Sequence, residues 1–119
     1  MRNFKELEIW DLGMKIVKDV YNISQKLPES EKFNLISQIT RAAVSIPSNI
    51  AEGCTKSSER EFKLYLERAL GSAFELETQI MIVSTLNNLD VQELITTIQS
   101  EQRKLGSFIS SVKNRLPKT

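Results

Sequence analysis

The sequence predicts an all-α protein folded as an antiparallel up-down-up-down four-helix bundle. Apolar residues recur at intervals of three and four along most of the 119 residues, and strand-like alternation is hard to find. The breaks between these periodic segments are short, which favours antiparallel neighbours. We expect helices at roughly 6–27, 31–53, 58–87 and 91–116, forming a single domain over residues 1–119.

The first expected helix has two apolar faces. One series contains Leu7, Trp10, Met14, Val17, Tyr21 and Ser24, and the other contains Ile9, Gly13, Ile16, Val20, Ile23 and Leu27. Because one core seam needs only one series, the second predicts a further protein contact. Pro28 ends this helix. Its start has two alternatives, a capping box at Asn3-x-x-Glu6 or a later start near Ile9 after an N-terminal arm.

The second expected helix carries very little charge. Its apolar seam is formed by Ile36, Ile39, Ala43, Ile46, Ile50 and Gly53. Between residues 33 and 55 the only charged residues are Arg41 and Glu52, although 26% of the chain is charged. We therefore expect protein on most sides of this helix. Pro47 should kink it, and Ser45 and Ser48 are placed to help satisfy the freed backbone.

Capping motifs and asparagines set the bounds of the last two expected helices. Ser58-x-x-Glu61 and Asp90-x-x-Glu93 read as capping boxes, and Asn87-Asn88 stops the third helix. The third seam contains Phe62, Leu66, Ala69, Ala73, Leu76, Ile80 and Val83, beside a second stripe of Leu70, Phe74 and Met81. The fourth seam contains Leu94, Ile98, Leu105, Phe108, Val112 and Leu116. The surplus of apolar faces over four helices predicts a homo-oligomer.

The composition argues against most kinds of catalytic site. The chain has no histidine and a single cysteine, Cys54, which excludes histidine-based triads, thiolate zinc sites and iron–sulfur clusters. Glu75 and Glu77 lie two residues apart on a helix and point to different faces, so they cannot share a proton or a metal ion. We expect no enzyme activity, no cofactor and no small-molecule substrate. No signal peptide or membrane span is recognisable, which predicts a cytoplasmic protein without a membrane partner.

Charge is nearly balanced overall but unevenly distributed. The net charge is +1, while residues 69–102 carry five acidic and no basic residues, and residues 103–119 carry five basic and no acidic residues. The basic group is the candidate RNA contact and consists of Arg103, Lys104, Lys113, Arg115 and Lys118. The alternative is that these cations stabilise the end of the last helix and keep an oligomer soluble.

One stretch of the second helix is more specific than an ordinary helix. It reads Gln38-x-x-Arg41-Ala-Ala-Val-Ser45-Ile-Pro47-Ser-Asn49-Ile-Ala-Glu52-Gly53. With Phe4-x-x-Leu7-x-x-Trp10, Leu27-Pro28, Ser58-x-x-Glu61-Phe62 and Ala69-x-Gly71-Ser72 followed by Glu75-Leu76-Glu77, it resembles the 23S rRNA-intervening-sequence proteins.

This resemblance implies a small bacterial four-helix bundle in the cytoplasm that assembles into a ring or barrel, typically a homopentamer. Relatives of similar fold are accessory proteins of diversity-generating retroelements and are thought to bind RNA and a reverse transcriptase. The resemblance carries over no catalytic residue.

The same residues also have a physical interpretation as a structural and interface motif. The motif comprises Gln38, Arg41, Ser45, Pro47, Asn49, Glu52, Gly53, Gly71, Glu75 and Glu77. Its small residues allow close helix approach, and its polar groups need partners on the next helix or subunit. The function predicted is a non-enzymatic homo-oligomeric scaffold or adaptor, with RNA or a nucleic-acid enzyme as partner. The alternative is a protein–protein interaction module without a nucleic-acid partner.

Overall fold

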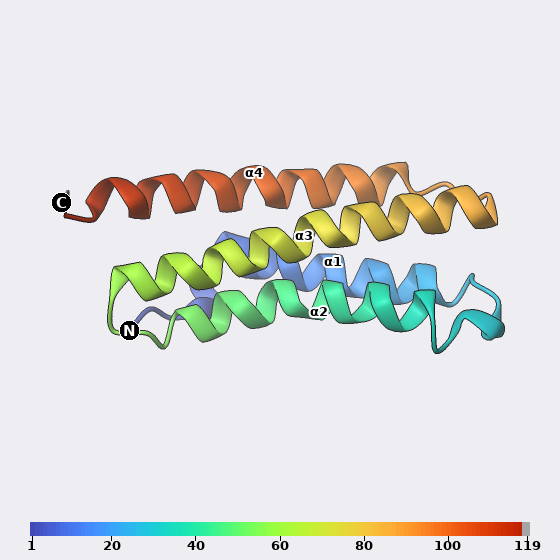
Figure 1. Ribbon diagram of the computed structural model, residues 1–119, viewed down its shortest axis with the longest axis horizontal. Coiled ribbons are helices and arrows are strands. Elements are labelled where there is room, and N and C mark those ends of the chain that lie inside the picture. Colours follow the sequence, from blue (N-terminus) through green and yellow to red (C-terminus); the bar gives the residue numbers. More distant parts are fainter. Residues whose placement is uncertain (118–119) are drawn as a thin grey trace.

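The computed structural model describes residues 1–117 and contains four long helices lying side by side (Figure 1). They are α1 (Glu8–Ser24), α2 (Leu35–Gly53), α3 (Glu59–Asn87) and α4 (Gln92–Arg115). Each helix runs antiparallel to the next in a bundle measuring 50 × 23 × 20 Å. The prediction of an all-α antiparallel four-helix bundle is confirmed.

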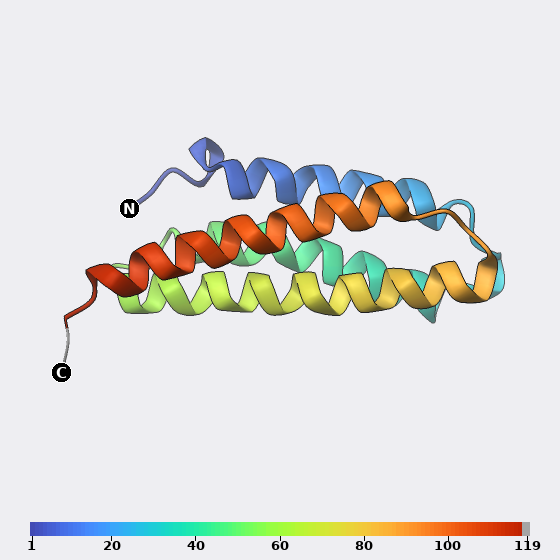
Figure 2. The same ribbon diagram turned by 90° about the horizontal axis from the view of Figure 1, so that it is seen from above.

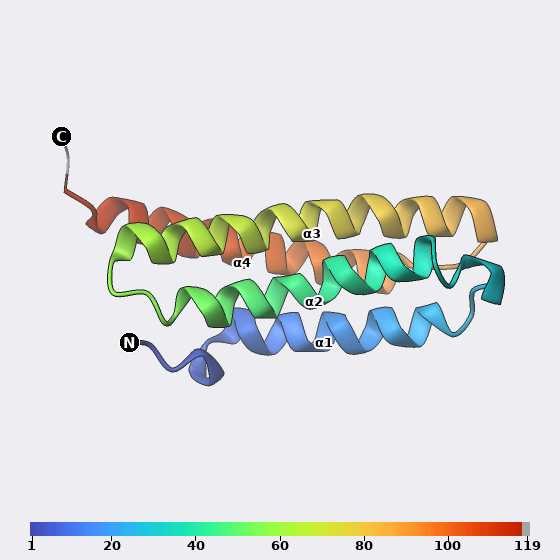
Figure 3. The ribbon, with the colours of Figure 1, turned by 60° about the horizontal axis from the view of Figure 1, so that its bottom comes forward.

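The four helices are not packed equally against one another. The contact between α2 and α3 is the most extensive, and the contact between α1 and α4 is the smallest of the four neighbouring pairs. Seen from above, α4 crosses at an angle beside α1 (Figure 2). The N-terminus and the end of α4 lie at the same end of the bundle as the connection between α2 and α3 (Figure 3). Because α1 and α4 contact each other least, the α1–α4 side of the bundle is the more open one.

The first helix begins later and ends earlier than the 6–27 expected. A short 3₁₀ helix, Phe4–Glu6, precedes it, and the Asn3 side chain accepts a hydrogen bond from the Lys5 amide at 3.1 Å. The alternative start near Ile9 is thus the one observed. The helix ends at Ser24, where the hydroxyl donates to the Val20 carbonyl at 2.9 Å.

The second helix begins at Leu35 rather than at residue 31, because a separate 3₁₀ turn occupies Glu29–Glu31. It then continues through Pro47 to Gly53. The Ser45 hydroxyl donates to the Ala42 carbonyl at 2.8 Å, and not to the carbonyl that Pro47 leaves without its helical donor.

The ends of α3 agree with the sequence, whereas the expected capping box of α4 is wrong. Ser58 accepts a hydrogen bond from the Glu61 amide at 3.1 Å, and Asn88 adopts a left-handed conformation with φ 52° just after α3. Asp90 instead accepts from the Gln92 amide at 3.1 Å, so it forms a local turn before α4 rather than capping it.

The core uses one of the two apolar faces of α1. Ile9, Ile16 and Val20 are buried against the other helices, whereas Met14 and Tyr21 on the second face remain 45% and 50% exposed. A single chain therefore leaves a second apolar surface on α1 partly open to solvent.

Candidate functional site

A groove of about 820 Å³ runs along the open side of the bundle between α1 and α4. Ser100, Ser107 and Ser111 line it from α4, and Ile9 and Phe108 supply apolar surface. These serines lie seven and four residues apart, so they share one face of α4. Their small side chains leave space between two helices that touch only sparsely. The groove therefore offers hydroxyl groups along most of its length.

Three of the predicted RNA-contact residues line this groove, namely Arg103, Lys104 and Arg115. Lys104 forms an ion pair with Glu8 of α1 across the groove. Arg103 is exposed and takes part in no ion pair within residues 1–117. Within the described residues, the groove thus contains one guanidinium without a carboxylate partner and two cations that have one.

The remaining two predicted contacts are placed differently. Lys113 is exposed on α4 but is not part of the groove lining. Lys118 lies outside the described residues. The structure thus brings three of the five predicted cations to the same groove.

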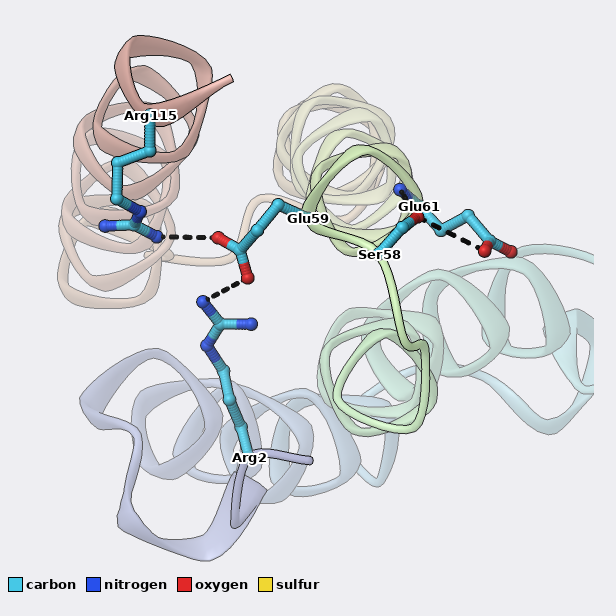
Figure 4. A network of polar contacts seen from close by, with 5 residues as sticks. All are labelled: Arg2, Ser58, Glu59, Glu61 and Arg115. Carbon is cyan, nitrogen blue, oxygen red and sulfur yellow. Dashed lines mark hydrogen bonds and ion pairs between the residues drawn. The ribbon is translucent and has the colours of Figure 1, made fainter. Parts of the chain in front are cut away.

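Arg115, which lines the groove, also belongs to a small network of polar contacts (Figure 4). Its guanidinium donates to the Glu59 carboxylate at 3.0 Å, and Arg2 reaches the other carboxylate oxygen at 2.7 Å. Arg2 also stacks on Phe62, with its guanidinium carbon 3.9 Å from the ring centre. The bonds from Arg115 and Arg2 lower the pKa of Glu59 below its ordinary value. This network ties the N-terminal arm, α3 and α4 together.

A buried carboxyl group that apolar periodicity does not predict lies in the core beside α1. Glu101 of α4 is 0% exposed, and neither of its carboxylate oxygens has a hydrogen-bond partner within residues 1–117. A Cβ built on Gly13 would lie 3.3 Å from Glu101 Oε2 and 3.4 Å from Pro47 Cβ. The glycine of α1 thus leaves the space that the carboxyl group occupies.

Burial makes Glu101 a weak acid. Desolvation raises the pKa of this carboxyl group to about 8, with Glu8 adding to the rise and Lys104 opposing it. A pattern in the sequence could have found it, because the apolar seam of α4 skips from Ile98 to Leu105. A step of seven residues, which is two helical turns, leaves one core-facing position between them, and Glu101 fills it. Its full burial separates it from any substrate, so it is no candidate acid catalyst.

Some residues of the predicted motif bond within the chain. Glu77 accepts hydrogen bonds from Gln99 at 3.0 Å and from Gln102 at 2.7 Å, both on α4. Glu52 accepts a bond from the Tyr65 hydroxyl at 3.3 Å, and Asn49 donates to the Ser45 carbonyl at 2.8 Å. Pro47 is buried, and Ser45 is half-buried.

The other motif residues face outward. Gln38, Arg41 and Glu75 are exposed, and Gly71 has no atom within 4 Å of where a Cβ would lie. Gly53, in contrast, is needed for close helix approach, because a Cβ there would lie 2.8 Å from the Tyr65 Cβ. The motif therefore combines an internal contact at Gly53 with an outward polar surface.

The cysteine and the possible metal ligands form no candidate site within residues 1–117. Cys54 is buried, and desolvation raises the pKa of its thiol. Within the described residues, no cluster of three or more metal-ligating side chains occurs. No helix in that part of the chain combines the length and apolar character that crossing a membrane requires.

Comparisons with known proteins agree with the fold. A family described as "23S rRNA-intervening sequence protein" matches residues 5–111. A crystal structure of a protein of unknown function, from the S23 ribosomal protein family of Bacteroides thetaiotaomicron, matches with a TM-score of 0.78 and 23% identity. The match covers 85% of this chain and 97% of the Bacteroides chain. No curated protein matches the sequence closely enough to carry an inference.

Proposed function

The chain belongs to the 23S rRNA-intervening sequence protein family, and from that premise we propose that it is a homo-oligomeric scaffold that binds RNA along the groove between α1 and α4. In this proposal the protein is not an enzyme and works in the cytoplasm, on RNA alone or on RNA held by a nucleic-acid enzyme. The family resemblance suggests a pentamer. The single observation that carries the RNA partner is a groove lined by cations and hydroxyl groups.

The lining has the chemistry that a phosphate backbone requires. Arginine and lysine neutralise phosphate charge, and serine hydroxyls donate to phosphate and ribose oxygens. Arg103 has no carboxylate partner within residues 1–117, whereas Lys104 and Arg115 would exchange Glu8 and Glu59 for phosphate. Because such binding releases counterions, we expect it to weaken steeply with salt.

RNA titration of groove variants tests this function. We expect saturable binding of a stem-loop RNA at about 50 mM salt and much weaker binding at about 200 mM. The double variant Arg103→Gln/Lys104→Gln should bind more weakly and reduce the slope of log K against log salt by about 1 for each lost contact. A matched control, Lys18→Gln/Lys32→Gln, removes two exposed lysines outside the groove. Absence of saturable wild-type binding at low salt would refute an RNA partner.

A protein–protein module is the second candidate, and exposed apolar side chains on α3 favour it. Phe74, Met81 and Leu86 are more than half exposed. An electrostatic version, in which residues 69–102 meet the basic end of α4, has less support. Of the five acidic residues in that segment, Glu77 is bonded to α4 and Glu101 is buried.

Neutralising the basic end of α4 separates the two candidates. Lys113→Gln combined with Arg115→Gln should leave assembly intact and weaken RNA binding if the groove serves RNA. Loss of assembled mass with no RNA binding in either protein would favour the protein–protein module.

A further inference from the structure

A second groove, which is apolar, lies between α1 and α2, on the face of the bundle next to the first groove. It has a volume of about 340 Å³, and Met14, Val17, Val44 and Ala51 are among the residues that line it. None of its lining residues is charged. Arg41 does not line the groove, but it precedes the lining residue Val44 by three residues on the exposed face of α2, which puts it about one turn away. This groove is thus an apolar recess beside one cation.

The outer face of α3 has the complementary character. Phe74 is 53% exposed and Leu86 is 69% exposed, and Gly71 leaves open space one turn before Phe74. Glu75 stands next to Phe74 and is exposed as well. Neither Glu75 nor Arg41 takes part in an ion pair within the described residues 1–117. This face therefore presents an apolar projection beside one anion.

The two surfaces stand at the same level along the bundle. The close contact of Gly53 with Phe62 and Tyr65 fixes the register of the antiparallel pair α2 and α3. Arg41 precedes Gly53 by 12 residues, and Glu75 follows Tyr65 by 10 and Phe62 by 13. At 1.5 Å per residue, both charges lie roughly 15–20 Å from that contact. The same count puts Phe74 near the level of Val44.

We infer that the α3 face of one copy docks in the α1–α2 groove of a second copy, with Phe74 entering the groove and Glu75 pairing with Arg41. A rotation that relates two copies about an axis parallel to the helices does not change the position of any residue along the bundle. It can therefore bring these residues together without a shift along the bundle. The two surfaces differ, which makes the contact head-to-tail and leads to a ring where the rotation closes. The inference rests on the proposed oligomeric scaffold and names its contacts.

Exchanging the two charges tests the contact. Arg41→Glu and Glu75→Arg should each lower the assembled mass in sedimentation experiments, with at least tenfold weaker association, because each places like charges opposite one another. The double variant Arg41→Glu/Glu75→Arg should restore assembly. Phe74→Asp should abolish it. The controls Lys18→Glu and Glu93→Arg reverse exposed charges outside both surfaces. Circular dichroism should show an unchanged helical fold in every variant.

The outcomes separate this inference from the proposed function. A wild-type protein that is monomeric at about 100 μM, a concentration at which contacts of micromolar affinity saturate, overturns both the scaffold and the contact. A wild-type oligomer unaffected by the single reversals and by Phe74→Asp overturns the contact alone. Assembly lost in the single variants and not restored in the double variant overturns the pairing of Arg41 with Glu75.

Discussion

The α2–α3 side and the α1–α4 side of this bundle differ in how their space is filled. On the first side, Gly53 allows α3 to approach closely, and Ala43 and Ala69 are fully buried. On the second side, a polar groove and a buried carboxyl group lie between helices that touch sparsely. The comparison teaches that close packing of α2 against α3 stabilises the fold. The α1–α4 side can therefore carry cations, hydroxyl groups and a buried carboxyl group, which contribute little to packing.

The largest effect is expected from a core residue of α3. Phe62 is 0% exposed and packs edge-on against Phe108 with ring centres 5.5 Å apart. Phe62→Ala should lower the free energy of unfolding by about 3–5 kcal/mol, because it removes buried apolar area and leaves a cavity. Urea unfolding measures the change. Phe33→Ala is the matched control, since Phe33 is 90% exposed and its loss should cost less than about 0.5 kcal/mol.

The buried carboxyl group on the other side should make stability depend on pH. The pKa of Glu101 rises from 4.5 to about 8 on folding, so the native state binds more protons than the unfolded state within that window. Stability should therefore fall as pH rises from 4.5 to 8, by roughly 1 kcal/mol per pH unit, and then level off. Denaturant midpoints measured across this pH range report the slope.

Glu101→Gln should remove this slope, because the amide does not ionise. The exposed Glu93 on the same helix supplies the control, and Glu93→Gln should keep the wild-type slope. If stability changed with pH in the same way in wild type and in Glu101→Gln between pH 4.5 and 8, the pKa of Glu101 would not be raised by folding. That result would contradict the buried, protonated carboxyl group.

A pair of glycines tests the close approach of α2 and α3. Gly53→Ala should cost about 1–3 kcal/mol, because its Cβ would lie 2.8 Å from the Tyr65 Cβ and would push the helices apart. In Gly71→Ala the new Cβ would have no neighbouring atom within 4 Å, so the substitution should stabilise the helix by about 0.5–1 kcal/mol. Thermal unfolding of both variants compares them directly. Equal effects at the two positions would mean that packing at Gly53 is not close.

The difference between the two sides also explains what the sequence could predict. Apolar periodicity placed Ile39, Ala69 and Leu76 correctly in the core, because burial of such side chains dominates folding. It missed Glu101, because a charged residue inside an apolar seam contradicts the pattern that locates the seam. The distance between α1 and α4 decides which cations line the groove, and residue periodicity carries no information about that distance. The interruption of the apolar seam between Ile98 and Leu105 points to Glu101 and not to the groove.

The smallest effect is expected from the surface ion pairs that join the N-terminal arm, α3 and α4. Glu59 joins Arg2 and Arg115 at the surface, and exposed ion pairs contribute about 0–1 kcal/mol. Glu59→Gln should therefore lower stability by less than about 1 kcal/mol, and the loss should shrink as salt screens the wild-type pairs.

The pH dependence of this network has the opposite sign to that of Glu101. Because the pKa of Glu59 is lowered on folding, its contribution is present above pH 4.5 and disappears as pH falls through the lowered pKa. Glu67→Gln removes an ion pair with Lys63 inside α3 and serves as the control. Both variants can be compared by hydrogen exchange of the N-terminal arm, which should speed up only in Glu59→Gln. An arm protected equally in both would mean that apolar contacts, such as Phe4 against Trp10, hold it without the charges.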